Sequence, residues 1–125
     1  MPDRVLIVDD HAPFRAIARR LLAASGFDVV GEAGDGESAL QACARLRPGV
    51  VLLDVGLPDL DGFAVAAALA GGADPPVVVL ISSRSRSDFG GRVDDAAARG
   101  FVPKGELSGE AVHRVLRGVG PCGTP

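Results

Sequence analysis

The chain alternates between short apolar runs and segments in which apolar residues recur with the period of a helix. Five apolar runs predict buried strands at residues 5–8, 29–30, 50–53, 77–81 and 101–102. The clearest helical pattern follows the first run, with Pro13 suited to its first turn and Gly26 to its end. Its apolar face carries, at helical spacing, Phe14, Ile17, Ala18, Leu21 and Leu22.

Four further helices are predicted, of which the one between Ser85 and Arg99 has the weakest pattern. A second helix opens at Asp35 as N-cap and turns inward Ala39, Ala42, Cys43 and Leu46. A third begins near Asp61 and carries residues 63–70, and the last has one apolar face made of Leu107, Val112, Val115, Leu116 and Val119. The segment between Ser85 and Arg99 is polar at its start and holds Gly90 and Gly91, which each cost about 1 kcal/mol relative to Ala inside a helix.

Strands that alternate with helices imply an α/β domain with an open parallel sheet and helices on both faces. We expect a doubly wound (βα)5 fold, flavodoxin-like, with five parallel strands in the order 2-1-3-4-5. The length of 125 residues suits one domain, which we assign to residues 1–119, followed by a flexible tail at residues 120–125.

Composition narrows the class of protein. The net charge of −3, without clustered Lys and Arg, argues against a nucleic-acid or membrane surface. Of the two cysteines, Cys43 is expected to be a buried thiol and Cys122 lies in the Gly/Pro tail, so no disulfide framework is indicated. No signal-peptide pattern or membrane-length apolar run is seen, and we expect a cytoplasmic location.

Three carboxylates stand where predicted strands end. Asp9 and Asp10 follow the first strand and Asp54 follows the third, and these strands are neighbours in the expected order. Two such charges about 4 Å apart repel by about 4 kcal/mol at an effective dielectric constant near 20. We therefore expect a cation among them, and an oxygen-only site with few protein ligands favours Mg²⁺.

The same edge of the sheet collects groups that bind phosphate. Strand four ends in Ser82 and Ser83, which offer a hydroxyl and backbone amides, and strand five leads into Lys104. A carboxylate, a divalent cation, a hydroxyl and an ammonium are what a transferred phosphoryl group requires, with Asp54 as its acceptor.

Each of these residues alone has a simpler explanation. Asp9 or Asp10 could cap the first helix, Asp54 and Ser82 could belong to turns, and Lys104 could be a solvated surface residue. Their joint occurrence at strand ends favours the pocket. Outside it, we interpret His11 and His113 as surface residues and Asp59 and Asp61 as a loop residue and a helix cap.

Four motifs resemble the receiver domain of bacterial response regulators. They are VDD at residues 8–10, LLDVGLPDLDG at 52–62, LISS at 80–83 and GFVPK at 100–104, and the resemblance extends from residue 4 to about 119. The segments VVGEAGDGESAL and PKGEL resemble the subgroup usually joined to a helix-turn-helix output domain. This resemblance implies a signalling receiver of two-component systems, which catalyses only its own phosphotransfer and dephosphorylation.

The resemblance also implies a role for each motif residue. Asp54 would accept phosphate from a sensor histidine kinase, with Mg²⁺ held by Asp54, Asp10 and the carbonyl of Gly56 and, through water, by Asp9. Lys104 would pair with the phosphoryl oxygens, beside the cofactor-binding position Ser83. Ser82 would be the switch hydroxyl and Phe101 the switch aromatic, and a downstream protein would bind the surface of helix four, strand five and helix five.

Three departures from the family pattern change these expectations. Ser82 replaces the commoner Thr but keeps the hydroxyl. Phe101 replaces the commoner Tyr and has no phenol, so an aromatic switch would work by packing alone. Gly56 brings no side chain to orient an attacking water, which predicts a phosphorylated form that loses phosphate slowly.

Other functions stay open. A phosphate-ester hydrolase that forms an aspartyl phosphate would need a second acid where Gly56 stands. A binding module that never uses phosphate would not need the acid, hydroxyl and lysine set. A flavin-binding domain lacks its phosphate loop after the first strand. Homodimerisation through the first and last helices, or through the face of the fourth, is undecided.

Overall fold

A computed structural model describes residues 3–118 and contains one parallel sheet of five strands in the order β2-β1-β3-β4-β5. The strands are β1 Arg4–Val8, β2 Asp28–Ala33, β3 Val50–Asp54, β4 Val77–Ser82 and β5 Gly100–Pro103. The predicted fold class and strand order are confirmed, and so are the positions of four of the five strands to within two residues. The predicted tail and Cys122 lie outside the described residues.

The prediction of β2 as residues 29–30 was too short, because the strand runs from Asp28 to Ala33. It lies at the edge of the sheet, pairs only with β1, and its register shifts between Val5 and Leu6. Its side chains are therefore only partly buried up to Ala33, and the continuous apolar run that marks a central strand is missing.

The helices begin where the predicted caps stand. Asp35 accepts a hydrogen bond from the Ser38 N–H at 2.7 Å at the start of α2 (Gly36–Leu46), and Asp61 accepts one from the Phe63 N–H at 2.7 Å at the start of α3 (Gly62–Ala70). Helix α1 spans Ala12–Ala24 and α5 spans Gly109–Leu116. Leu107, predicted on the face of the last helix, precedes α5, and Val119 lies outside the described residues.

The segment between Ser85 and Arg99 contains two short pieces instead of one helix. A single 3₁₀ turn, η1, spans Arg86–Phe89, and α4 spans only Arg92–Asp95. Gly90 separates them with φ of +59°, in the left-handed region that favours glycine. The weak helical pattern noted in the sequence therefore corresponds to a break in the backbone.

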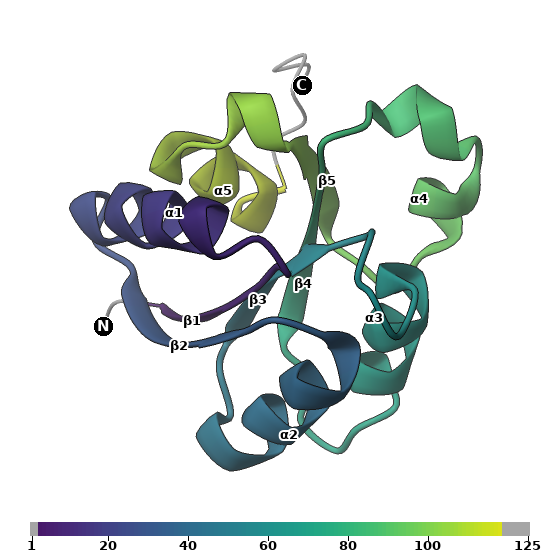
Figure 1. The fold of residues 1–125 in the computed structure, drawn as a ribbon, viewed down its shortest axis with the longest axis horizontal. Coiled ribbons are helices and arrows are strands. Elements are labelled where there is room, and N and C mark those ends of the chain that lie inside the picture. The colour runs from purple at the N-terminus through teal and green to yellow at the C-terminus, as the bar shows by residue number, and fades with distance from the viewer. Residues whose placement is uncertain (1–2, 119–125) are drawn as a thin grey trace.

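Helices cover both faces of the sheet, as Figure 1 shows: α1 and α5 lie on one side, and α2, α3 and α4 on the other. Side chains alternate between the two cores along the fully buried central strand β3, whose last residue is Asp54. Of the helices within residues 3–118, none has the length and apolarity needed to cross a membrane.

Cys43 packs against the core beneath α2 and is half-buried rather than fully buried. Burial raises the pKa of its thiol to about 11, so the thiol is un-ionised at neutral pH.

Candidate functional site

Asp9 immediately follows β1 and is completely buried. Its backbone N–H donates to the Ala33 carbonyl at 3.0 Å, and its Oδ1 accepts the His11 N–H at 2.8 Å. The next residue, Asp10, is exposed at the surface of the same loop. Helix α1 has His11 as its N-cap with no side-chain cap, so neither acid has the simple capping role that the sequence left open.

Asp54 ends β3 and is 5% exposed. Its Oδ1 accepts the Gly56 N–H at 3.1 Å. Burial raises the pKa of Asp54 above its ordinary value, and the Gly56 N–H and the Lys104 ammonium only partly oppose that effect. A cation beside this buried carboxylate would stabilise its ionised form.

The loop after Asp54 is folded tightly against the end of β3. Gly56 forms a bridge with Asp61, and the Gly62 N–H donates to the Val55 carbonyl at 2.9 Å. A Cβ on Gly62 would lie 2.5 Å from the Asp54 carbonyl oxygen, so only glycine allows α3 to begin this close to the strand. The loop therefore keeps Gly56 beside the Asp54 carboxylate.

Lys104, which follows β5, reaches both buried acids. Its Nζ lies 2.6 Å from Asp9 Oδ2 and 3.2 Å from Asp54 Oδ2, and 4.8 Å from the centre of the Phe14 ring. Burial alone would lower the pKa of Lys104, but the two carboxylates prevail and raise it, so the ammonium stays charged.

The three acids form one cluster, since a carboxylate oxygen from each of Asp9, Asp10 and Asp54 lies within 4.8 Å of the others. Three carboxylates (−3) and the Lys104 ammonium (+1) leave a local charge of −2 when all are ionised. Asp9 Oδ2 is buried and, apart from its ion pair with Lys104, accepts no hydrogen bond of ordinary geometry from any residue between 3 and 118. The charge and the all-oxygen donor set therefore fit a divalent cation such as Mg²⁺.

Ser82 and Ser83 lie at the same edge of the sheet. Asp54 pairs in register with Ile81 on β4, so Ser82 is one residue further along that strand. Ser82 is buried and its Oγ accepts the Arg84 N–H at 3.0 Å, whereas Ser83 is exposed. No hydrogen bond joins Ser82 to the acids among the described residues.

Phe101 is half-buried on the side of the sheet that carries α3 and α4, away from the acids. Its ring centre lies 5.9 Å from that of Phe89 in η1, and Phe89 lies 5.7 Å from Phe63 of α3. Arg84 lies over Phe89 with 5.1 Å between the guanidinium and the ring centre. This row of aromatic rings connects β5 with the broken segment 85–99.

Three residues make contacts that were not predicted from the sequence. Arg15 donates from Nη1 to the Asp9 carbonyl at 2.6 Å, and Phe14 lies beneath the Lys104 ammonium. Asp59, interpreted as a loop residue, accepts the Gly36 and Glu37 N–H groups of α2 at 2.7 and 3.0 Å. These backbone amides hold the pKa of Asp59 below its ordinary value. Each of these contacts joins segments that are brought together only by the tertiary structure. Local periodicity and capping patterns therefore do not predict them.

The two histidines differ from each other. His11 is exposed, as expected. His113 is half-buried, so its interpretation as a surface residue was wrong: its ring stacks on Phe27 with centres 4.3 Å apart, and its Nε2 lies 3.1 Å from the Ser25 carbonyl oxygen.

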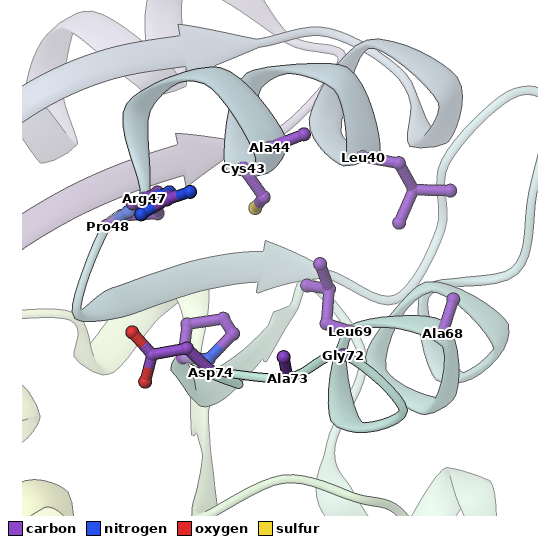
Figure 2. Close-up of a pocket in the computed structure, with 11 residues that line it drawn as sticks. Leu40, Cys43, Ala44, Arg47, Pro48, Ala68, Leu69, Gly72, Ala73 and Asp74 are labelled. Carbon is purple, nitrogen blue, oxygen red and sulfur yellow. The ribbon is translucent and has the colours of Figure 1, made fainter.

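A cavity of about 500 Å³ lies between α2 and α3, away from the acidic cluster. Figure 2 shows Leu40 and Cys43 facing Leu69 across it, with Arg47 and Asp74 near one end. It contains none of the groups singled out for phosphoryl chemistry, so the acidic edge of the sheet is the candidate site.

Comparisons with known proteins agree with this geometry. A family model described as the response regulator receiver domain matches residues 5–116. The transcriptional regulatory protein PdtaR of Mycobacterium tuberculosis is 36% identical over 104 residues, which cover 83% of this chain and 50% of PdtaR. The chain spans about half the length of the curated relatives that it matches, with shares of 57% and 54% for one protein of Pseudomonas aeruginosa and one of Bordetella pertussis.

Solved structures show the same likeness. The signal receiver domain of NarL from Mycobacterium tuberculosis is 36% identical with a TM-score of 0.83, and the match covers 98% of this chain and 96% of that domain. A two-component response regulator of the LuxR family from Aurantimonas sp. SI85-9A1 is 26% identical with a TM-score of 0.83, over 94% of this chain and 84% of that one. These matches agree with the resemblance to the subgroup that carries an output domain.

Proposed function

The chain belongs to the response-regulator receiver family of two-component signalling, and we propose that Asp54 accepts a phosphoryl group from a sensor histidine kinase in the presence of Mg²⁺. One observation carries the proposal. Lys104 bridges Asp9 and Asp54, and the two acids share with Asp10 a cluster whose net charge suits a divalent cation. The kinase and a cytoplasmic location belong to the same proposal.

The chemistry assigns one step to Asp54. A carboxylate oxygen attacks the phosphorus of a phosphohistidine, the new P–O bond forms as the P–N bond breaks, and the leaving imidazole takes up a proton. Bound Mg²⁺ would neutralise the charge that develops on the phosphoryl oxygens. Asp9, Asp10, Asp54 and the Gly56 carbonyl are the groups that would hold it.

The remaining groups bind the phosphoryl oxygens on Asp54. Lys104 already lies 3.2 Å from Asp54 Oδ2, so its ammonium needs little movement to pair with them. Ser82 would donate its hydroxyl, with the backbone N–H of Ser83 beside it. In the structure the Ser82 hydroxyl oxygen accepts the Arg84 N–H, so a turn of the hydroxyl toward phosphate would alter the start of the segment that follows β4.

That movement gives the signal a route to the surface. Arg84 lies over the Phe89 ring, and Phe89 packs against Phe101. We propose that the phosphorylated state repacks these groups and changes the surface of α4, β5 and α5, where a downstream protein binds.

The other candidate functions have less support. A hydrolase would need an acid or base near Asp54 Oδ1, and the exposed Gly56 offers no side chain there. A binding module that pairs with a partner without using phosphate would have no need to bury Asp9 and Asp54 beside Lys104. Burying these charges costs solvation free energy.

The experiment adds acetyl phosphate with and without Mg²⁺ and follows the intact mass of the protein. We expect a Mg²⁺-dependent gain of one phosphoryl group in the wild type and none in Asp54→Asn. An adduct that persists in Asp54→Asn would place the modification elsewhere. No adduct at early and late times would reject the receiver chemistry and favour the phosphate-independent module.

A further inference from the structure

Arg15 joins the acidic loop to the edge strand of the sheet. It lies in the first turns of α1, where its Nη1 donates to the Asp9 backbone carbonyl at 2.6 Å. Its Nε donates to Glu32 Oε1 on β2 at 3.0 Å, and its side chain is only 21% exposed. One guanidinium therefore holds together α1, the end of β1 and β2.

This contact restrains the orientation of Asp9. The Asp9 N–H donates to the Ala33 carbonyl, and the Asp9 C=O accepts from Arg15, so both backbone polar groups of this residue are held. Because the peptide unit is planar, fixing the Asp9 carbonyl also fixes the amide plane that begins Asp10. The two adjacent acids of the cluster are thus oriented through one peptide group.

Glu32 keeps Arg15 in place and also binds a second arginine. Arg19 donates from Nε to Glu32 Oε2 at 2.8 Å and reaches the Val29 carbonyl at 3.5 Å, with no contact to Asp9. The hydrogen bond from Arg19, together with that from Arg15, lowers the pKa of Glu32 despite some burial, so the anchor is ionised at neutral pH. Arg19 is therefore a matched control: it has the same charge, helix and partner but lacks the link to the acidic loop.

We propose that Arg15, anchored by Glu32, is a positioning residue that holds the Asp9–Asp10 peptide in the orientation in which the acids bind a divalent cation. The inference rests on the proposed function of the cluster. It predicts that removing Arg15 weakens Mg²⁺ binding, although Arg15 is itself a cation close to the site. Simple Coulomb repulsion would make its removal tighten Mg²⁺ binding, whereas loss of positioning would weaken it.

The test is a calorimetric titration of Mg²⁺ into the wild type, Arg15→Gln and Arg19→Gln. We expect the dissociation constant to rise about 10- to 100-fold in Arg15→Gln, the range for groups that orient metal ligands, and to stay within about 2-fold in Arg19→Gln. Arg15→Lys keeps the charge and a donor group but loses the planar fork that reaches two partners, and it should recover part of the affinity. Tighter or unchanged binding in Arg15→Gln would overturn the proposal.

A second measurement needs no metal. The His11 amide donates to Asp9 Oδ1 at 2.8 Å, so its proton resonance and its exchange with water report the carboxylate orientation. In metal-free Arg15→Gln this proton should shift upfield and exchange several-fold faster, whereas Arg19→Gln should match the wild type. An unaltered His11 amide in Arg15→Gln contradicts the inference.

The two measurements separate failure of the inference from failure of the proposed function. A wild type that binds no Mg²⁺ would reject the proposed function, and the His11 amide would still decide whether Arg15 orients Asp9. Both variants lose one ion pair with Glu32, so thermal unfolding should give them similar stability.

Discussion

Lys104 lies closer to Asp9 than to the proposed phosphate acceptor: its Nζ is 2.6 Å from Asp9 Oδ2 and 3.2 Å from Asp54 Oδ2. Asp9 is wholly buried and has no other partner for that oxygen among residues 3–118. Lys104 is therefore the counter-ion of both acids in the structure. A cation that enters the cluster competes with it.

This competition predicts opposite effects of Lys104→Met on stability and on metal binding. Without Mg²⁺ the variant should lose about 1–3 kcal/mol of unfolding free energy, because the buried carboxylates are left unpaired. Its Mg²⁺ affinity should rise several-fold, since the competing ammonium is gone. Urea unfolding with and without Mg²⁺ measures both, because a ligand stabilises according to its affinity. Lys104→Arg is the charge-preserving control, and an equal Mg²⁺ increment in Lys104→Met and wild type would contradict the argument.

The pKa of Asp54 predicts an unusual pH dependence of stability. Burial raises this pKa above the usual 3.8. At pH values between 3.8 and the raised pKa, the folded state therefore binds more protons than the unfolded state. Metal-free wild type should therefore gain stability relative to Asp54→Asn as pH falls from neutral through the folded-state pKa of Asp54. Thermal unfolding of both proteins in EDTA between pH 7 and about pH 4 measures the difference. A constant difference across this range would show that Asp54 is not destabilised by burial.

Gly56→Asn should accelerate phosphate loss from Asp54. A Cβ at Gly56 would have Asp54 Oδ1 as its nearest neighbour at 4.0 Å, and the residue is exposed, so the side chain fits without strain. An amide there can orient the attacking water, and we expect a loss at least several-fold faster than the slow loss predicted for the wild type. Intact mass followed after removal of the phosphate donor gives both rates, and Gly56→Ala controls for the added bulk. Wild-type loss within seconds would refute the premise.

The sequence predicted the meeting of the acids because parallel strands end at one edge of a sheet. Val8 pairs in register with Leu53, which brings the residues that follow, Asp9 and Asp54, side by side. The apolar runs predicted the strands, and the expected flavodoxin-like order 2-1-3-4-5 made the first and third strands neighbours. They could not reveal which acid Lys104 would approach, since a flexible four-carbon side chain reaches several positions and its choice depends on burial.

Contacts between segments distant in the sequence were not predicted either. Asp59 binds the α2 amides of Gly36 and Glu37, 23 and 22 residues earlier in the chain, and Arg15 binds Glu32 on an edge strand whose pattern was too weak to delimit. Local propensity indicated that the fourth helix would be weak around Gly90 and Gly91, but the break itself was not predicted; Gly90 allows it because glycine adopts a positive φ at little cost. The sequence therefore predicted features that depend on local backbone preference and on strand order. It did not predict which partners side chains contact in distant segments.

Phe101→Ala should disconnect the site from the surface without disabling it. The ring packs on Phe89, 5.9 Å between centres, and touches none of the acids, so phosphorylation of Asp54 and Mg²⁺ affinity should match the wild type. Loss of a half-buried ring should cost about 1–2 kcal/mol of stability, less than a fully buried Phe. Hydrogen exchange of segment 85–99, with and without acetyl phosphate, should show a phosphate-dependent change in the wild type and in Phe101→Tyr, which keeps the ring, but not in Phe101→Ala. Phosphate-dependent binding of a downstream protein should weaken in parallel. If Phe101→Ala keeps the full exchange response, the signal reaches the surface by a route that does not pass through the Phe89–Phe101 contact.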